Sequence, residues 1–134
     1  MSVPSQPGST PIGSVAVFEE RPWWAPELQR QFRDEAISVR GCRSAADAFR
    51  ADVAVLQLGA APAEVLHGLA RRMSAGSDRG VIIVAKSELS DVEWGVRELG
   101  ADAFVSEQIA GEDLARLCRR QLEKVREQTW LIPV

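Results

Sequence analysis

The chain has 134 residues, of which 46% are hydrophobic and 26% charged, and its formal net charge is -3. This length and composition predict one globular domain that buries a core without needing disulfides or metals. The slight acidic excess argues against nucleic-acid binding, and no apolar run of about 18 residues could cross a membrane. The two cysteines, Cys42 and Cys118, are far apart, which is typical of a reducing compartment, so we expect a cytoplasmic protein.

The first 13 residues differ in composition from the rest. They are rich in Ser, Pro, Gly and Thr, carry no charged side chain, and lack the basic start of a signal peptide. We expect residues 1–13 to form a disordered arm, residues 14–126 the domain, and residues 127–134 a C-terminal tail.

Five short apolar runs predict five strands. The expected strands are residues 14–18, 36–39, 53–58, 81–84 and 103–105. The third and fourth runs are apolar at nearly every position, which is typical of strands covered on both faces. Glu19 and Glu20 end the first run abruptly, as expected where a strand reaches solvent.

The first two helices are predicted between these strands. Pro26 suits a first helical turn, and Leu28, Phe32 and Ala36 then recur at four-residue spacing. A short second helix is predicted after Ser44, since Ser is a good N-cap and an acid follows three residues later at Asp47. Trp23 and Trp24, just before the first helix, are expected to fold over the edge of the core.

Three more helices are predicted further along the chain. One covers residues 62–73 and should bury a single face, made of Val65, Leu66, Leu69 and Met73. The next should begin with a capping box of Ser90 and Glu93 and end at Gly100. Its inward face is expected to hold Val92, Val96 and Leu99. The last helix covers residues 111–126, with Leu114, Leu117, Cys118, Leu122 and Val125 facing inward.

Strands that alternate with helices predict a doubly wound parallel α/β sheet with helices on both faces. Functional sites in such sheets lie at the carboxyl ends of the strands. The residues expected there are Glu19, Glu20, Gln57, Ala85, Lys86, Ser106 and Glu107.

This pattern resembles the receiver domain of bacterial response regulators over roughly residues 14–126. The likeness depends on the strand–helix alternation, on the acidic pair after the first strand, and on the stretch Leu-Gly-Ala-Asp-Ala-Phe-Val at 99–105. The resemblance implies a flavodoxin-like, five-stranded parallel sheet of order 2-1-3-4-5 flanked by five helices.

The resemblance also implies a site for phosphoryl transfer. Receivers bind magnesium with two acids after strand one and phosphorylate an aspartate that ends strand three. A Ser or Thr after strand four and a Lys after strand five contact the phosphoryl group. The matching positions here hold Glu19 and Glu20, Gln57, Ala85 and Glu107. A carboxamide cannot form an acyl phosphate, so we expect a pseudo-receiver that is not an enzyme and has no catalytic residue.

The degenerate pocket is predicted to contain Glu19, Glu20, Gln57, Ala85, Lys86 and Glu107. Lys86 is hypothesised to pair with Glu107 or Glu20 and fill it. Magnesium binding by Glu19, Glu20 and the Gln57 oxygen is chemically feasible, but two solvated acids at a strand tip are the simpler interpretation. We therefore expect no metal and no cofactor.

The favoured function is phosphorylation-independent protein–protein contact in bacterial two-component signalling, with a homodimer through helices four and five as one form. Trp94 is about 200° from Val92 around a helix and should face outward, as interface anchors do. The candidate contact residues are Trp94, Arg97, Arg116 and Arg120.

The alternative function is small-molecule or ion sensing at the strand ends, by Glu19, Glu20, Gln57 and Lys86. Flavin binding is disfavoured because the loop after the first strand is acidic and its prolines lack N–H donors. His67 is the single histidine and has no partner ligand in the sequence for a metal site. No nucleophile–base pair supports a hydrolase.

Overall fold

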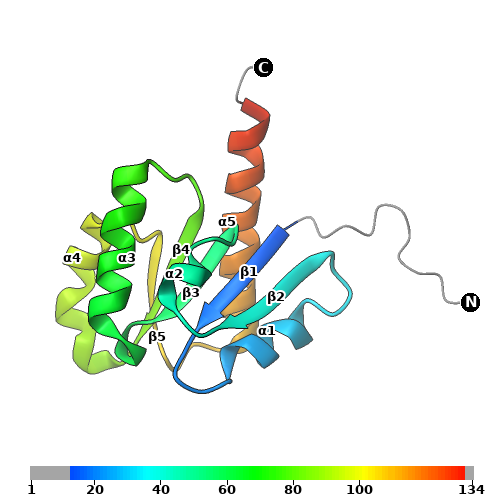
Figure 1. The fold of residues 1–134 in the computed structure, drawn as a ribbon. Helices are drawn as coiled ribbons and strands as arrows, with labels where there is room; N and C mark the ends of the chain where they lie inside the picture. The colour runs from blue at the N-terminus through cyan, green and yellow to red at the C-terminus, as the bar shows by residue number, and fades with distance from the viewer. Residues whose placement is uncertain (1–12, 132–134) are drawn as a thin grey trace, which may run out of the picture.

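The computed structural model describes residues 13–131, and side chains as far as residue 127. Of the arm expected at residues 1–13, residues 1–12 lie outside the described part, as do residues 132–134, and Gly13 begins the first strand instead. Five parallel strands form one sheet in the order β2-β1-β3-β4-β5, which confirms the predicted fold class (Figure 1). The strands are β1 (Gly13–Phe18), β2 (Ile37–Cys42), β3 (Val53–Gln57), β4 (Gly80–Ala85) and β5 (Ala103–Ser106).

Helices cover both faces of this sheet (Figure 1). One face packs against α1 (Trp24–Gln31) and α5 (Gly111–Leu131). The other packs against α2 (Ala45–Ala48), α3 (Pro62–Ala75) and α4 (Glu93–Glu98). Two 3-10 segments, η1 (Leu58–Ala60) and η2 (Ser87–Val92), follow β3 and β4. β5 is an edge strand of the sheet. α4 and α5 lie on opposite faces of the sheet beside it.

The core consists of two apolar layers separated by the sheet. Alternate residues of each central strand enter opposite layers, as in Val15 and Val17 on the α1–α5 side and Ala16 on the α2–α3 side. β3 and β4 are buried along nearly their whole length, as their continuous apolar runs predicted.

The first helix ends earlier than its apolar spacing predicted. α1 ends at Gln31, and Ala36 lies outside it and is exposed. Phe32 is still buried, and the Arg119 guanidinium from α5 lies 5.1 Å from the centre of its ring. Glu35 pairs with the same arginine at 2.6 Å. The chain therefore turns at Phe32–Glu35 against α5, and β2 begins one residue later than expected.

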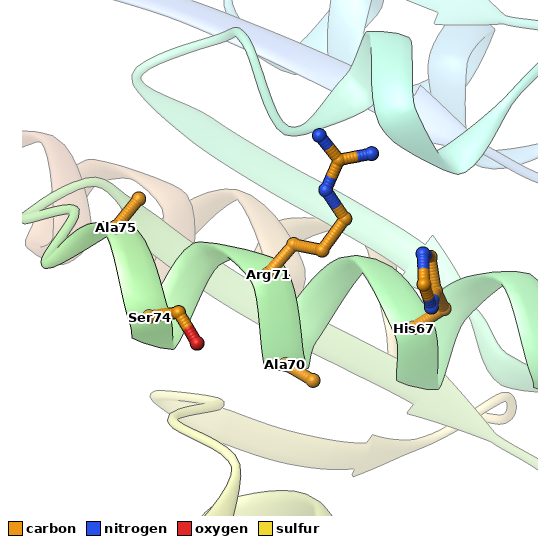
Figure 2. Close-up of a pocket in the computed structure, with 5 residues that line it drawn as sticks. All are labelled: His67, Ala70, Arg71, Ser74 and Ala75. Carbon is orange, nitrogen blue, oxygen red and sulfur yellow. The ribbon is translucent and has the colours of Figure 1, made fainter.

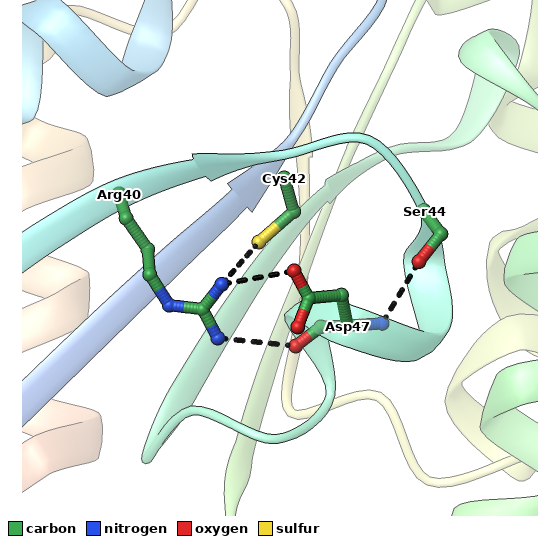
Figure 3. Close-up of polar contacts among 4 residues, drawn as sticks. All are labelled: Arg40, Cys42, Ser44 and Asp47. Atoms are coloured by element: carbon green, nitrogen blue, oxygen red, sulfur yellow. Dashed lines mark hydrogen bonds and ion pairs between the residues drawn. The ribbon is translucent and has the colours of Figure 1, made fainter.

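The second helix begins as predicted, but its acid does not complete a capping box. The Ser44 hydroxyl accepts a hydrogen bond from the Asp47 N–H at 3.1 Å. The Asp47 carboxylate instead accepts one from Arg40 of β2 at 3.0 Å, and Arg40 also donates to the Cys42 sulfur (Figure 3). Burial raises the pKa of the Cys42 thiol. These contacts attach α2 to the edge strand.

Of the four residues predicted for the inward face of the third helix, two are buried and two are exposed. Val65 and Leu69 are buried, whereas Leu66 is 37% and Met73 54% exposed. The second flank of the buried face is Gly68, where an added Cβ would collide with the Phe49 ring. The Phe49 ring, just after α2, packs against Gly68. The buried face of α3 is therefore centred on Val65, Gly68 and Leu69, and Leu66 and Met73 lie outside it.

The fourth helix does not begin with the predicted capping box. Ser90 lies inside η2, α4 starts at Glu93, and no side chain caps it. Val92 is 42% exposed, while Val96 is buried and Leu99 packs against the core. A 3-10 segment places side chains three residues apart in line, which differs from the α-helical spacing assumed for this stretch.

Gly100 ends α4 as predicted, with a φ of 101° that disfavours other residues. Arg72 of α3 donates a hydrogen bond to the Gly100 carbonyl at 3.0 Å and lies 3.6 Å from the Asp102 carboxylate. That carboxylate also accepts from the Val81 N–H at 2.8 Å. Burial lowers the pKa of the Arg72 guanidinium. One mostly buried arginine thus joins α3 to the start of both β4 and β5.

The last helix extends to Leu131, beyond the predicted end at residue 126. Of its expected inward residues, Leu114, Cys118 and Leu122 are buried, and Leu117 and Val125 are partly exposed. Gln121 is also buried, packed over Gly80, a contact that the apolar pattern could not predict. Both cysteines are free thiols. Burial raises the pKa of Cys118 to about 12 and also raises the pKa of Cys42, so neither thiol is activated.

Candidate functional site

The predicted strand-end residues gather at one edge of the sheet. Glu19 and Glu20 follow β1, Gln57 ends β3, and Glu107 follows β5. Together with the loop that precedes α1, they line a hollow of about 240 Å³. The lining residues are Glu19, Glu20, Arg21, Trp23, Trp24, Gln57 and Glu107. The parallel sheet therefore brings together four of the residues that the resemblance assigns to the receiver site.

The Gln57 carboxamide is held from both sides. Its oxygen accepts a hydrogen bond from the Glu20 N–H at 2.8 Å, and its nitrogen donates one to the Glu107 carboxylate at 3.1 Å. An amide can make both bonds at once, because it has an acceptor and a donor on one group. A carboxylate could not donate to Glu107. At the position where receivers carry the phosphoryl acceptor, this chain has a neutral cross-link between β1, β3 and the loop after β5.

Glu19 is directed to the start of α1. Its two carboxylate oxygens accept hydrogen bonds from the Trp24 and Ala25 N–H groups, at 2.9 and 3.0 Å. Trp23 occupies the N-cap position and offers no side-chain acceptor, so the free N–H groups of the first turn need another partner. The sequence prediction missed this role. The signal was present, because an acid stands just before a helix that lacks a Ser, Thr, Asp or Asn cap.

These bonds leave a poor site for magnesium. Both oxygens of Glu19 already accept hydrogen bonds, and the Gln57 oxygen accepts one from Glu20. Mg²⁺ requires near-octahedral oxygen ligands that point at one centre. Within residues 13–127, no three His, Cys, Asp or Glu side chains cluster in a way that could hold a metal. The residues present do not fit the ion that the resemblance implies.

The two remaining pocket positions do not supply the missing groups. Ala85 is buried and offers only its carbonyl, which accepts from the Glu107 N–H at 2.9 Å. Lys86 is exposed, and in the described part of the chain it makes no ion pair with Glu107 or Glu20. The hypothesised pairing of Lys86 is therefore not formed among the described residues, and Glu107 accepts a hydrogen bond from the Gln57 amide.

The two tryptophans before α1 separate, contrary to the prediction that both fold over the core. Trp24 is 5% exposed and packs in the α1–α5 layer, whereas Trp23 is 68% exposed. Their rings meet edge to face, with centroids 6.3 Å apart. Trp23 therefore forms an open wall of the hollow.

The candidate partner residues lie on two helices that flank the edge strand β5. Trp94 and Arg97 lie on α4, on one side of the sheet, and Arg116 and Arg120 lie on α5, on the other. Trp94 is 75% exposed, as its helical position predicted. Arg97 pairs with Glu93 at 2.8 Å within its own helix. Arg116 likewise pairs with Asp113 at 2.9 Å, and Arg120 is exposed.

No helix in residues 13–131 has both the length and the apolar character needed to span a bilayer. Scans against models of protein families and against curated proteins find no match to this chain. Solved structures do match, at low sequence identity.

The signal receiver domain of a protein described as a LuxO repressor from Vibrio parahaemolyticus is 16% identical, with a TM-score of 0.78. The match covers 91% of this chain and 98% of that domain. The receiver domain of the TorR response regulator is 20% identical with a TM-score of 0.71, over 84% and 98% of the two chains. NtrX from Brucella abortus, solved with ADP, is 16% identical with a TM-score of 0.71; the match covers 91% of this chain and 30% of NtrX.

These matches cover 84–91% of this chain, with TM-scores of 0.71–0.78. Identities of 20% or less carry the fold and not the chemistry of the site. The protein therefore has the fold of response-regulator receiver domains.

Proposed function

We propose that this protein is a pseudo-receiver: a signalling module of the two-component type that works without phosphorylation and acts through protein–protein contact. The observation that carries the proposal is the Gln57 carboxamide, bonded to Glu20 on one side and to Glu107 on the other. In place of a nucleophile, this position holds a fixed hydrogen-bonded link between the strands.

The electrostatics of the site support the same conclusion. Phosphoryl transfer requires positive charge around the transferred group. Here the position of the receiver lysine holds Glu107, and the Glu19 carboxylate is bound to the start of α1. An incoming phosphoryl group would meet carboxylates without a metal between them. The proposed module is accordingly not an enzyme. Its fold gives it one signalling state, which phosphorylation does not change.

Phosphoryl transfer is tested by incubating the protein with acetyl phosphate and Mg²⁺ and measuring its intact mass. A receiver domain with its aspartate present serves as the positive control. We expect no phosphoryl adduct on this protein under conditions that modify the control. A stoichiometric adduct, labile in base as an acyl phosphate is, would contradict the proposal.

Trp94 is the strongest candidate contact residue, because its indole is 75% exposed in the described part of the chain. Arg97, Arg116 and Arg120 stay predictions of the contact surface. A pull-down from host lysate should lose its partner with Trp94→Ala. Trp23→Ala, which removes an indole of similar exposure elsewhere, is the matched control.

A second candidate function is supported by the hollow at the strand ends. Glu20 and Glu107 line it, and Trp23 leaves it open to a small ligand or ion. Thermal unfolding in the presence of divalent cations, compared between the natural protein and Glu20→Gln, tests this alternative. A rise in melting temperature that the variant loses would favour sensing.

A further inference from the structure

The exposed apolar side chains of the domain are concentrated on one side of the sheet. Five large hydrophobic residues are exposed among those described, and four of them belong to α3, η2 and α4. They are Leu66, Met73, Val92 and Trp94. Isolated exposed residues are common, but a group on one face indicates a surface that is covered in use.

α3 carries a hollow on its outer surface. The hollow measures about 440 Å³ and is lined by His67, Ala70, Arg71, Ser74 and Ala75 (Figure 2). The three small side chains leave room above the helix, while His67 and Arg71 extend beside them. Arg71 and His67 form no ion pair in the described part of the chain. The surface offered to a partner is therefore shallow, partly apolar and cationic.

α4 offers the complementary shape and charge. The Trp94 indole projects from it with 75% of its surface exposed. Asp91 lies in η2, three residues before Trp94, and Glu98 lies in α4, four residues after it, so one acid stands on each side of the indole along the chain. Both are exposed, and neither makes an ion pair within the described residues. η2 and α4 together thus present a large aromatic side chain between two carboxylates.

We propose that these two surfaces bind each other in a homodimer, with Trp94 of each copy seated in the α3 hollow of the other. α3 and α4 cover the same face of the sheet, so a two-fold axis between two copies can form both contacts at once. Arg71 would lie near the acids beside Trp94 and could stack on the indole. A second copy is the occupant favoured by the complementary charge of the two helices.

This inference rests on the proposed function, since it identifies the partner of Trp94 as a second copy of the chain. It differs from a dimer through helices four and five, because α5 lies on the other face of the sheet. The two proposals can fail separately. Self-association is measured with no phosphoryl donor present, and the acetyl phosphate experiment gives its answer whether or not the protein dimerises.

The test is sedimentation equilibrium of the full 134-residue chain over a range of concentrations. We expect a dimer that Trp94→Ala weakens by about thirtyfold or more in dissociation constant, as for an interface anchor. Ala70→Glu should weaken it as well, by filling the hollow. Two matched controls, Trp23→Ala and Ala36→Glu, change exposed residues outside the two surfaces and should leave the dimer intact.

A charge exchange makes the test specific. Arg71→Glu and Asp91→Arg each place like charges across the interface and should each weaken the dimer. An equimolar mixture of the two variants should recover it, because both contacts of the mixed dimer then pair opposite charges. A monomer at every concentration would overturn the proposal. So would a dimer that resists Ala70→Glu, or a mixture that stays as weak as its components.

Discussion

Replacing Gln57 with aspartate, the residue receivers carry at this position, should destabilise this protein. The informative comparison is between Gln57→Asp and Gln57→Asn. Both side chains are one methylene shorter than glutamine, so both lose the bonds to Glu20 and Glu107. They differ only in charge. The amide–carboxylate bond is half-exposed, and its loss should cost about 1 kcal/mol in either variant.

The aspartate variant should lose more, because its carboxylate faces the carboxylate of Glu107. Two like charges at about 4 Å cost about 1 kcal/mol in water and about 4 kcal/mol at the effective dielectric of a protein surface. Since Gln57 and Glu107 are both partly exposed, the lower half of this range applies. We expect Gln57→Asp to be about 1–2 kcal/mol less stable than Gln57→Asn, and the difference to shrink in high salt.

Urea unfolding at low ionic strength measures these differences. Adding Glu107→Lys turns the repulsion into an attraction, so it should stabilise the Gln57→Asp variant while removing a hydrogen bond from the natural protein. The coupling energy between Gln57→Asp and Glu107→Lys should be favourable and should exceed about 1 kcal/mol. Equal stability of the Asp and Asn variants, or no coupling with Glu107→Lys, would refute the account of Gln57 as a neutral link between carboxylate neighbours.

Three further substitutions test the packing of α3 and the Glu35–Arg119 ion pair. Gly68→Ala should destabilise the fold by about 1–2 kcal/mol despite the better helix propensity of alanine, because its Cβ would collide with Phe49. Gly95→Ala, with open space around its Cβ, should be neutral or stabilising by up to about 1 kcal/mol, and equal effects in urea unfolding would contradict the packing of α3. The hydrogen bond from Arg119 holds the pKa of Glu35 below its ordinary value of 4.5, so its stabilisation is present above pH 4.5 and is lost as the pH falls through the lowered pKa. The pair is over a third exposed, so Glu35→Gln should cost less than about 1 kcal/mol at pH 7, with the deficit vanishing in acid; a deficit independent of pH would argue against the pair.

The sheet could be predicted from the sequence because each strand is a short apolar run. The three central strands are apolar at nearly every position, as expected for strands that are buried on both faces. The edge strand β2 was harder to place, since only half of its side chains are covered and its start depends on how Phe32 and Glu35 meet α5. Contacts of this kind join distant parts of the chain and leave no periodic signal.

Four of the six predicted pocket residues line the hollow at the strand ends, whereas Ala85 and Lys86 do not, and the hydrogen bonds of the site were not predicted. Parallel strands bring Glu19, Gln57 and Glu107 to one edge, and the alternation of strands and helices was enough to place them there. That Gln57 links Glu20 to Glu107, and that Glu19 binds the first turn of α1, depends on side-chain directions that spacing cannot give. Ser90 was misplaced for a related reason, since a 3-10 segment precedes α4.

Arg72, whose side chain is mostly buried, links elements that must separate when this domain opens. Its guanidinium bonds to the Gly100 carbonyl and pairs with Asp102, whose carboxylate holds the first amide of the buried run in β4. Separating α3 from the β4–β5 edge would break this hydrogen bond and this ion pair together, so the end of α3 and that edge should open as one unit. The amides of Val81 and Asp102 should therefore exchange with solvent deuterium with one common free energy, as members of a single cooperative unit.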